Sequence, residues 1–156
     1  MRRPGDLRVT TEMNKATKVG IIACSGEEIA EGTISRSAVR RVLESLRPHD
    51  TVTLCLPLFL AGNEGERNFA RNHPTITIDG CDKQCARVGT EKHGGPVGRS
   101  LVVTDILGSR ATGCSRSLRH RGQADEKAVA TVAERIAAEV DALMGETAEA
   151  EDDGSS

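Results

Sequence analysis

The sequence predicts a single three-layer α/β domain, in which a four-stranded parallel sheet is covered by helices on both faces. Short apolar runs alternate four times with amphipathic segments, which is the pattern of repeated βα units. The first run, at residues 18–24, is apolar after Lys18, as expected for a strand buried on both faces. The length of 156 residues suits one domain. Right-handed crossovers leave few topologies, and we expect a flavodoxin-like or Rossmann-like sheet with strand order 2-1-3-4.

The four expected strands lie at residues 18–24, 51–56, 75–78 and 100–107. The second strand should stop at Pro57, because proline cannot donate to a sheet ladder. The third alternates threonine with isoleucine, and these β-branched residues pack well on a pleated surface. An Asp-Gly pair then marks its end.

Helices are expected between these strands and after the last one. The first should run from Thr33 to Leu46, because apolar residues recur there at helical spacing. A second is expected between residues 58 and 72, and a third should begin near residue 81. Asp125 is expected to cap the last helix, since aspartate side chains accept hydrogen bonds from the first helical amides.

The domain itself is expected to span residues 18–144. Residues 1–17 form a basic tail without apolar periodicity, and residues 145–156 hold five acids and no base. We expect both tails to be disordered, because neither can bury enough apolar surface to offset the entropy of ordering. Residues 108–123 contain four arginines and no acid, and they are interpreted as a basic loop.

Composition narrows the class of protein. The net charge of −2 argues against nucleic-acid binding, and no apolar run approaches the roughly 18 residues that a membrane span needs. The basic start lacks the apolar segment of a secretory signal, so we expect a cytoplasmic protein. Its five cysteines are then expected to be reduced rather than paired in disulfides.

Four of the cysteines follow the predicted strands. Cys24 ends the first strand, Cys55 lies at the end of the second, and Cys81 follows the third, with Cys85 one helical turn later. Because the carboxyl ends of parallel strands share one edge of a sheet, these thiols should converge in space. Four thiolates are the ligand count of a closed zinc site, and they also suit an iron–sulfur cluster or copper(I). A single buried cysteine would be an ordinary small apolar residue.

Other uses of the thiols remain open. Cys81 and Cys85 would share one helix face near the amino-terminal end, where the dipole stabilises a thiolate, so they could serve a thiol redox or transfer enzyme. The stretch from Cys81 to Arg87 also has the C-x5-R spacing of thiol phosphatases, but it lacks the glycines of an anion-binding loop. Cys114 lies in the basic loop and is interpreted as an unrelated exposed thiol.

Several segments resemble one known family. Asp79-Gly80-Cys81 followed by Cys85-Ala86, together with ACSG at 23–26, is similar to the DGC-domain proteins, which are named for this Asp-Gly-Cys motif. The stretches at 32–42 and 102–105 are also similar, so that the resemblance covers roughly residues 18–107. It implies a zinc-binding protein whose ligands are Cys24, Cys55, Cys81 and Cys85. It implies no reaction, and a protein partner that receives the metal stays open.

Overall fold

The computed structural model of the chain describes residues 17–26, 29–108 and 125–153, and a four-stranded parallel sheet lies at its centre. The strands are β1 (Val19–Ala23), β2 (Thr51–Val52), β3 (Thr75–Asp79) and β4 (Arg99–Val102). Their order is β2-β1-β3-β4, with every neighbouring pair parallel. This confirms the predicted fold class and topology, with the first strand in the interior of the sheet.

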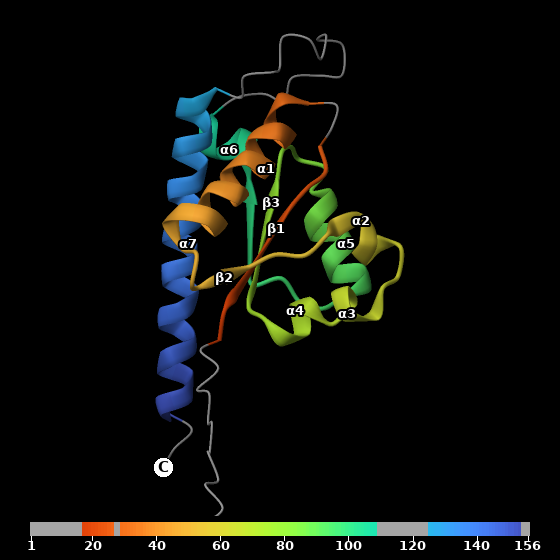
Figure 1. Cartoon of the computed structure of the whole chain (residues 1–156), viewed down its shortest axis with the longest axis vertical. Helices are drawn as coiled ribbons and strands as arrows, with labels where there is room; N and C mark the ends of the chain where they lie inside the picture. Colours follow the sequence, from red (N-terminus) through yellow and green to blue (C-terminus); the bar gives the residue numbers. More distant parts are fainter. Residues whose placement is uncertain (1–16, 27–28, 109–124, 154–156) are drawn as a thin grey trace, which may run out of the picture.

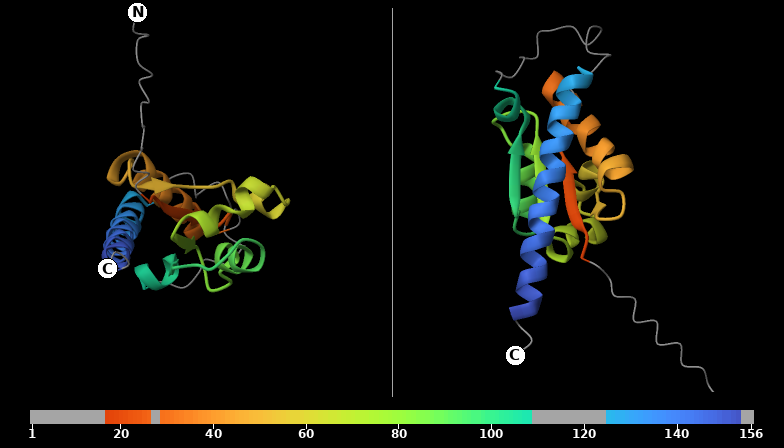
Figure 2. Two further views of the ribbon diagram at one scale, coloured as in Figure 1. Left: turned by 90° about the horizontal axis from the view of Figure 1, so that it is seen from below. Right: turned by 90° about the vertical axis from the view of Figure 1, so that its left-hand side faces the viewer.

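Helices cover both faces of this sheet (Figures 1 and 2). One face carries α1 (Ala30–Arg41), its π-helical continuation η1 (Val42–Leu46), α6 (Val103–Leu107) and α7 (Glu126–Asp153). The other carries α2 (Leu56–Leu60), α3 (Glu64–Arg67), α4 (Phe69–Asn72) and α5 (Cys85–His93). The molecule therefore has the three layers that the alternating pattern predicts.

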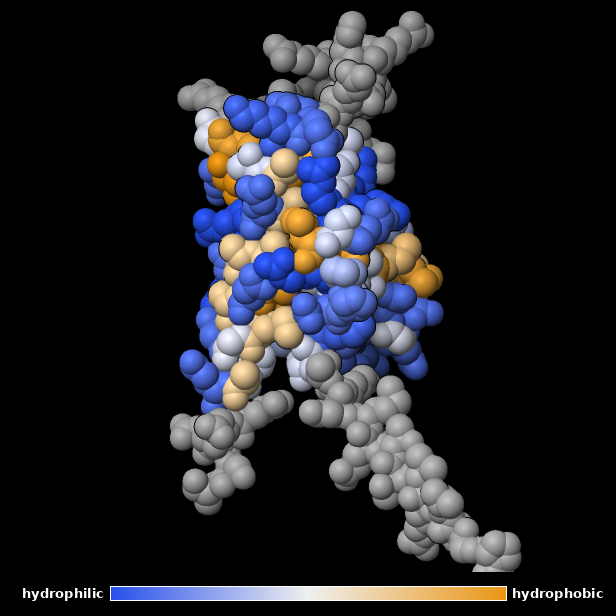
Figure 3. All heavy atoms as spheres, turned by 60° about the vertical axis from the view of Figure 1, so that its left-hand side comes forward, coloured by the Kyte–Doolittle hydropathy of each residue, from blue (hydrophilic) through white to orange (hydrophobic). Residues whose placement is uncertain are grey.

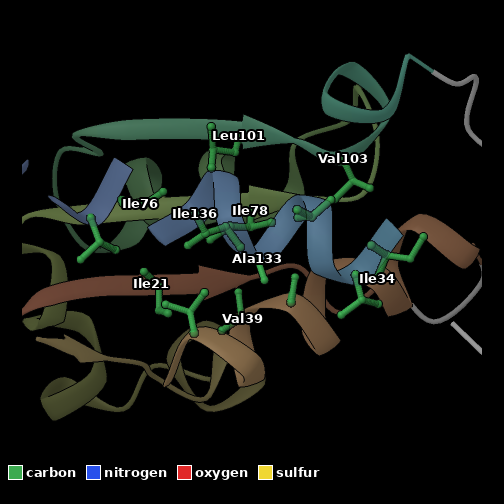
Figure 4. Close-up of a cluster of buried hydrophobic side chains, with 14 of the residues drawn as sticks. Ile21, Ile34, Val39, Ile76, Ile78, Leu101, Val103, Ala133 and Ile136 are labelled. Carbon is green, nitrogen blue, oxygen red and sulfur yellow. The ribbon is translucent and has the colours of Figure 1, made fainter. Parts of the chain in front are cut away.

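The main core lies between the sheet, α1 and α7 (Figure 4). Ile21 of β1 and both isoleucines of β3, Ile76 and Ile78, are fully buried there. They pack in one cluster with Val39 of α1 and Ile136 of α7. Since the chain has no tryptophan or tyrosine, branched aliphatic side chains fill this layer. On the opposite face a smaller cluster contains Ile22, Cys24, Leu56, Phe59 and Ala86.

Helix α7 is the longest element and lies along the whole sheet (Figure 2). The carboxylate of Asp125 accepts a hydrogen bond from the amide of Lys127 at 3.1 Å, as expected for the predicted cap. The helix continues to Asp153, past Gly145, where we expected a disordered tail to begin. Alanine and glutamate, which dominate this stretch, are strong helix formers, and Glu146 forms an ion pair with Arg99. The face on this side of the molecule is mixed, with hydrophilic residues interspersed among apolar ones (Figure 3).

The second strand is shorter than predicted, and this changes the position of one cysteine. β2 ends at Val52 instead of residue 56, and α2 begins at Leu56. Pro57 lies in the first turn of α2, where a missing amide N–H costs little, so it starts a helix instead of only ending a strand. Cys55 is therefore the residue that precedes a helix. The hydroxyl of Thr53 donates to the Ile21 carbonyl at 2.6 Å and keeps this segment beside β1.

Other boundaries also differ from those expected. α1 begins at Ala30, one turn before the predicted Thr33, and its N-cap residue Ile29 provides no side-chain hydrogen bond. The segment 58–72 contains short helices instead of one, because Gly62 adopts a left-handed φ of 96° that ends α2. The fourth strand stops at Val102, and Asp105 lies in α6 rather than near the end of a strand.

Some predictions fall outside the described residues: the order of residues 1–16, the basic loop at 108–123 apart from its first residue, and the exposure of Cys114 in it. Among the described helices, none combines the length and the apolar character that crossing a membrane requires. The cytoplasmic location stays a prediction.

Replacement of Ile136 by alanine tests the main core. Ile136 is fully buried between α7 and the sheet, so we expect the variant to lose about 2–5 kcal/mol of unfolding free energy, measured by urea denaturation. Val88 on α5 is 55% exposed, and Val88→Ala should change stability by only about 0.5 kcal/mol. Equal losses in the two variants would contradict this account of the core.

Candidate metal centre

The predicted metal ligands lie at or next to the carboxyl ends of the strands. Cys24 directly follows β1, and Cys81 comes two residues after β3. Cys55 precedes α2, and Cys85 is the first residue of α5. All four are free thiols. Cys24 is buried and Cys81 half-buried, while Cys55 and Cys85 are exposed.

Cys24 is held by hydrogen bonds from two distant parts of the chain. Its sulfur accepts the backbone N–H of Gly80 at 3.2 Å, which joins the end of β1 to the Asp-Gly-Cys turn after β3. The sulfur also lies 3.5 Å from the hydroxyl of Ser35 on α1, and that hydroxyl donates to the Gly32 carbonyl at 2.7 Å. Burial raises the pKa of the Cys24 thiol, while the hydrogen bonds with Ser35 and Gly80 oppose this effect. The protonated thiol of Cys24 is therefore favoured over the thiolate until a cation stabilises the thiolate.

Three glycines let the backbone close around this sulfur. Gly26, in the loop after β1, has a left-handed φ of 40°, and its α-carbon packs against Gly32 in the first turn of α1. Gly80 packs against the same turn, where a β-carbon at Gly80 would lie 2.7 Å from the Gly32 nitrogen. No side chain fits between these backbones. The loop after β1, the start of α1 and the turn after β3 thus meet in direct contact.

Asp79 is fully buried and supports α5 from its amino-terminal end. One carboxylate oxygen accepts the amide of Ala86 at 2.8 Å, and the other accepts the amide of Arg87 at 3.2 Å. Burial raises the pKa of Asp79, whereas the two amide hydrogen bonds and the charge of Arg87 oppose that rise. Sequence reasoning missed this capping role, because Asp79 lies six residues before α5 begins and matches no standard capping motif.

The turn between Cys81 and α5 corrects one prediction. Gln84 adopts a left-handed conformation, with φ 48° and ψ 48°. Its backbone N–H donates to the Cys81 carbonyl at 3.2 Å. The helix begins only at Cys85. The expectation that Cys81 and Cys85 share one helix face is therefore wrong, since Cys81 lies in the preceding turn. Such a conformation is uncommon for a residue other than glycine, and the sequence gives no signal for it.

The thiols approach one another to different degrees. The Cys85 thiol is within electrostatic range of Cys24 and contributes to the rise in its pKa. Cys24 and Cys55 both line a cavity of about 310 Å³ between α1 and the segment that joins β2 to α2. Among residues 17–26, 29–108 and 125–153, however, no three His, Cys, Asp or Glu side chains come close enough to hold a metal ion. Soft donors are present at one edge, but they are not assembled into a ligand cage.

Replacement of Gly80 by alanine tests the contact around Cys24. The added methyl group would meet the backbone of α1, so we expect a loss of about 1–3 kcal/mol of unfolding free energy. Gly145 is a matched control, because a β-carbon there meets nothing within 4 Å. Gly145→Ala should stabilise α7 by roughly 0.5–1 kcal/mol. Unchanged stability of the Gly80 variant would show that the contact is not tight.

Replacement of Asp79 tests the buried cap. Asp79→Ala leaves two amides of α5 without acceptors and should cost about 1–2 kcal/mol in urea denaturation.

Asp79→Asn should reveal the raised pKa through the pH dependence of stability. Between the ordinary value of 3.8 and the raised pKa, the folded state keeps a proton that the unfolded chain has lost. Wild-type stability should therefore fall as pH rises through this window, and the Asn variant should lack that component. Parallel pH profiles for the two proteins would refute the assignment.

Comparisons with known proteins identify the family. The profile of the DGC domain matches residues 20–124, which is more than half of the chain and includes Cys24, Cys55, Cys81 and Cys85. No match was found among curated proteins or among solved structures. Family membership supports metal binding as the general function. The chain therefore belongs to the DGC domain family.

Proposed function

We propose that this protein binds zinc through the thiolates of Cys24, Cys55, Cys81 and Cys85. The observation that carries the proposal is the hydrogen bond from the Gly80 amide to the Cys24 sulfur. It holds the thiol at the end of β1 against the turn that carries Cys81. Such N–H donors to sulfur are the outer-shell contacts that orient thiolate ligands and tune a metal centre.

The donor set at this edge favours a soft, thiolate-binding metal. The buried carboxylate nearest to the thiols along the chain is Asp79, and both of its oxygens already accept amides of α5. Asp79 is therefore engaged as a cap of α5. Four thiolates suit zinc, which takes tetrahedral sulfur ligands and imposes no further geometric preference.

Closing the site requires movement of the exposed thiols. Cys24 is fixed by its hydrogen bonds, and Cys81 directly follows Gly80 in the contact with α1. Cys55 and Cys85 are exposed, so their side chains can change rotamer without unpacking a core. We propose that zinc binding draws these two thiols toward Cys24 and Cys81, and that the bound zinc is structural or is passed to a protein partner.

The cysteine variants give the most direct test of the ligand set. Replacement of any one of Cys24, Cys55, Cys81 and Cys85 by serine should remove most of the zinc, because a neutral hydroxyl is a poor zinc ligand. Cys114→Ser is the matched control and should keep about one zinc per chain, the stoichiometry of one closed four-thiolate site. Zinc content is measured by elemental analysis after loading under reducing conditions and gel filtration.

Each alternative has its own outcome in this experiment. Ready alkylation of Cys81 and Cys85 in a wild-type protein that contains no metal would favour the thiol redox or transfer enzyme, because a closed zinc site protects its thiolates. A brown protein that contains iron and sulfide would favour an iron–sulfur electron carrier, because zinc is colourless. Wild-type protein that takes up no metal at all would refute the proposal.

A further inference from the structure

The cavity beside Cys24 and Cys55 has the properties of a ligand pocket. It has a volume of about 310 Å³ and lies at the carboxyl end of β1 and β2, between α1 and the segment Thr53–Pro57. Small-molecule sites usually measure roughly 300–1,000 Å³, and open parallel sheets bind ligands at this edge. Size and position therefore both suit a small molecule.

The walls of the pocket are largely apolar. Val39 of α1 and Leu43 of η1 line one side, while Leu54, Leu56 and Pro57 line the other. Val39 and Leu56 are buried, and Leu43 and Leu54 are partly buried, so these walls belong to the packed structure. A ligand that fills this space should therefore present an apolar body to it.

The charged residues among the described lining of the pocket are both arginines. Arg36 and Arg40 of α1 contribute guanidinium groups, and no carboxylate occurs among the described residues that line the cavity. Arg36 donates to the Thr33 hydroxyl at 3.3 Å, and Arg40 forms an ion pair with Glu44. These contacts hold the arginines on the α1 side of the pocket, where a planar guanidinium can also receive a carboxylate.

We propose that this cavity binds a small organic anion, with its apolar body between α1 and the β2–α2 segment, its charged end at Arg36 and Arg40, and one side against Cys24 and Cys55. The ligand would thus lie beside the thiols of the candidate zinc site. The inference goes beyond zinc binding and does not depend on it, because the apolar walls and the two arginines that define the pocket are not among the proposed zinc ligands.

Two other cavities in the described structure lack this combination. One, of about 330 Å³, lies at the outer edge of β4, and Asp105 is among its lining residues together with Arg87 and Arg135. Another, of about 270 Å³, is lined by residues 70–75 and 96–98, around the amino-terminal start of β3. No cysteine lines either cavity. The pocket at Cys24 and Cys55 alone, among these three, joins apolar walls, positive charge and thiols.

Binding is tested with 4-fluorobenzoate, an apolar ring that carries one carboxylate, observed by fluorine NMR. The full-length protein is kept in EDTA and a phosphine reductant, so that the result does not depend on zinc. We expect saturable binding of 4-fluorobenzoate and much weaker binding of the neutral 4-fluorobenzamide. Arg36→Gln should weaken benzoate binding about tenfold, the usual effect of losing one charge-assisted hydrogen bond. Arg135→Gln, in the cavity at β4, should leave the affinity unchanged.

A second measurement locates the ligand without any substitution. Cys55 lines the pocket and Cys85 does not, yet both thiols are exposed. Bound 4-fluorobenzoate should therefore slow alkylation of Cys55 by iodoacetamide and leave the rate at Cys85 unchanged, as measured by peptide mass spectrometry. Leu43→Trp, which fills the cavity, should abolish both the binding and the protection, and its fold is checked by circular dichroism.

Several results would overturn the inference. These are no benzoate binding, equal affinity for the benzoate and the benzamide, an affinity that Arg36→Gln leaves unchanged, and equal protection of Cys55 and Cys85. Since the experiment contains no metal, a failure of zinc binding affects none of these outcomes. Conversely, zinc bound by the wild type together with no benzoate binding would refute only the pocket.

Discussion

The close backbone contact around Cys24 is the constraint on which the candidate site depends. Gly26, Gly32 and Gly80 bring the loop after β1 and the start of α1 into contact with the distant turn after β3, and the Gly80 amide donates to the Cys24 sulfur. Any side chain at Gly80 would separate the turn after β3 from α1. The thiol of Cys24 and the turn that carries Cys81 would then lose their fixed relation.

The Asp-Gly-Cys motif assigns a different physical task to each residue. Asp79 accepts two amides of α5 from a fully buried position and fixes the start of that helix, where Cys85 lies. Gly80 permits the contact with α1 and donates its amide to Cys24. Cys81 supplies a half-buried thiol. The motif thus organises one edge of the sheet around sulfur, and this organisation supports the proposed use of the thiols as metal ligands.

The sequence contains enough information to predict the sheet and its order, because the apolar runs at β1 and β3 have strong β-branched character and the helices between them are amphipathic. It also placed Cys24, Cys55, Cys81 and Cys85 near the carboxyl ends of the strands. The details that decide how these thiols are presented were not predictable. Pro57 starts a helix, so β2 is shorter than predicted. Gln84 adopts a left-handed conformation, so Cys81 lies in the turn before α5 and not on the helix.

The helix start at Pro57 and the left-handed turn at Gln84 depend on tertiary contacts that periodicity does not reveal. Thr53 satisfies a carbonyl of β1 with its side chain, and Asp79 satisfies the amides of α5 from outside the helix. A pattern of apolar residues carries no information about such bonds, so boundaries near a functional edge are harder to predict than the core. The extension of α7 past Gly145 was missed for a different reason: its last turns lack an apolar face and rely on helix propensity.

X-ray absorption at the zinc edge would test the central claim most directly, on wild-type protein loaded with zinc under reducing conditions. The account predicts a first shell of four sulfur atoms at about 2.3 Å, the distance for zinc held by cysteine thiolates. A first shell made only of nitrogen and oxygen at about 2.0–2.2 Å would contradict the assignment of Cys24, Cys55, Cys81 and Cys85 as the ligands.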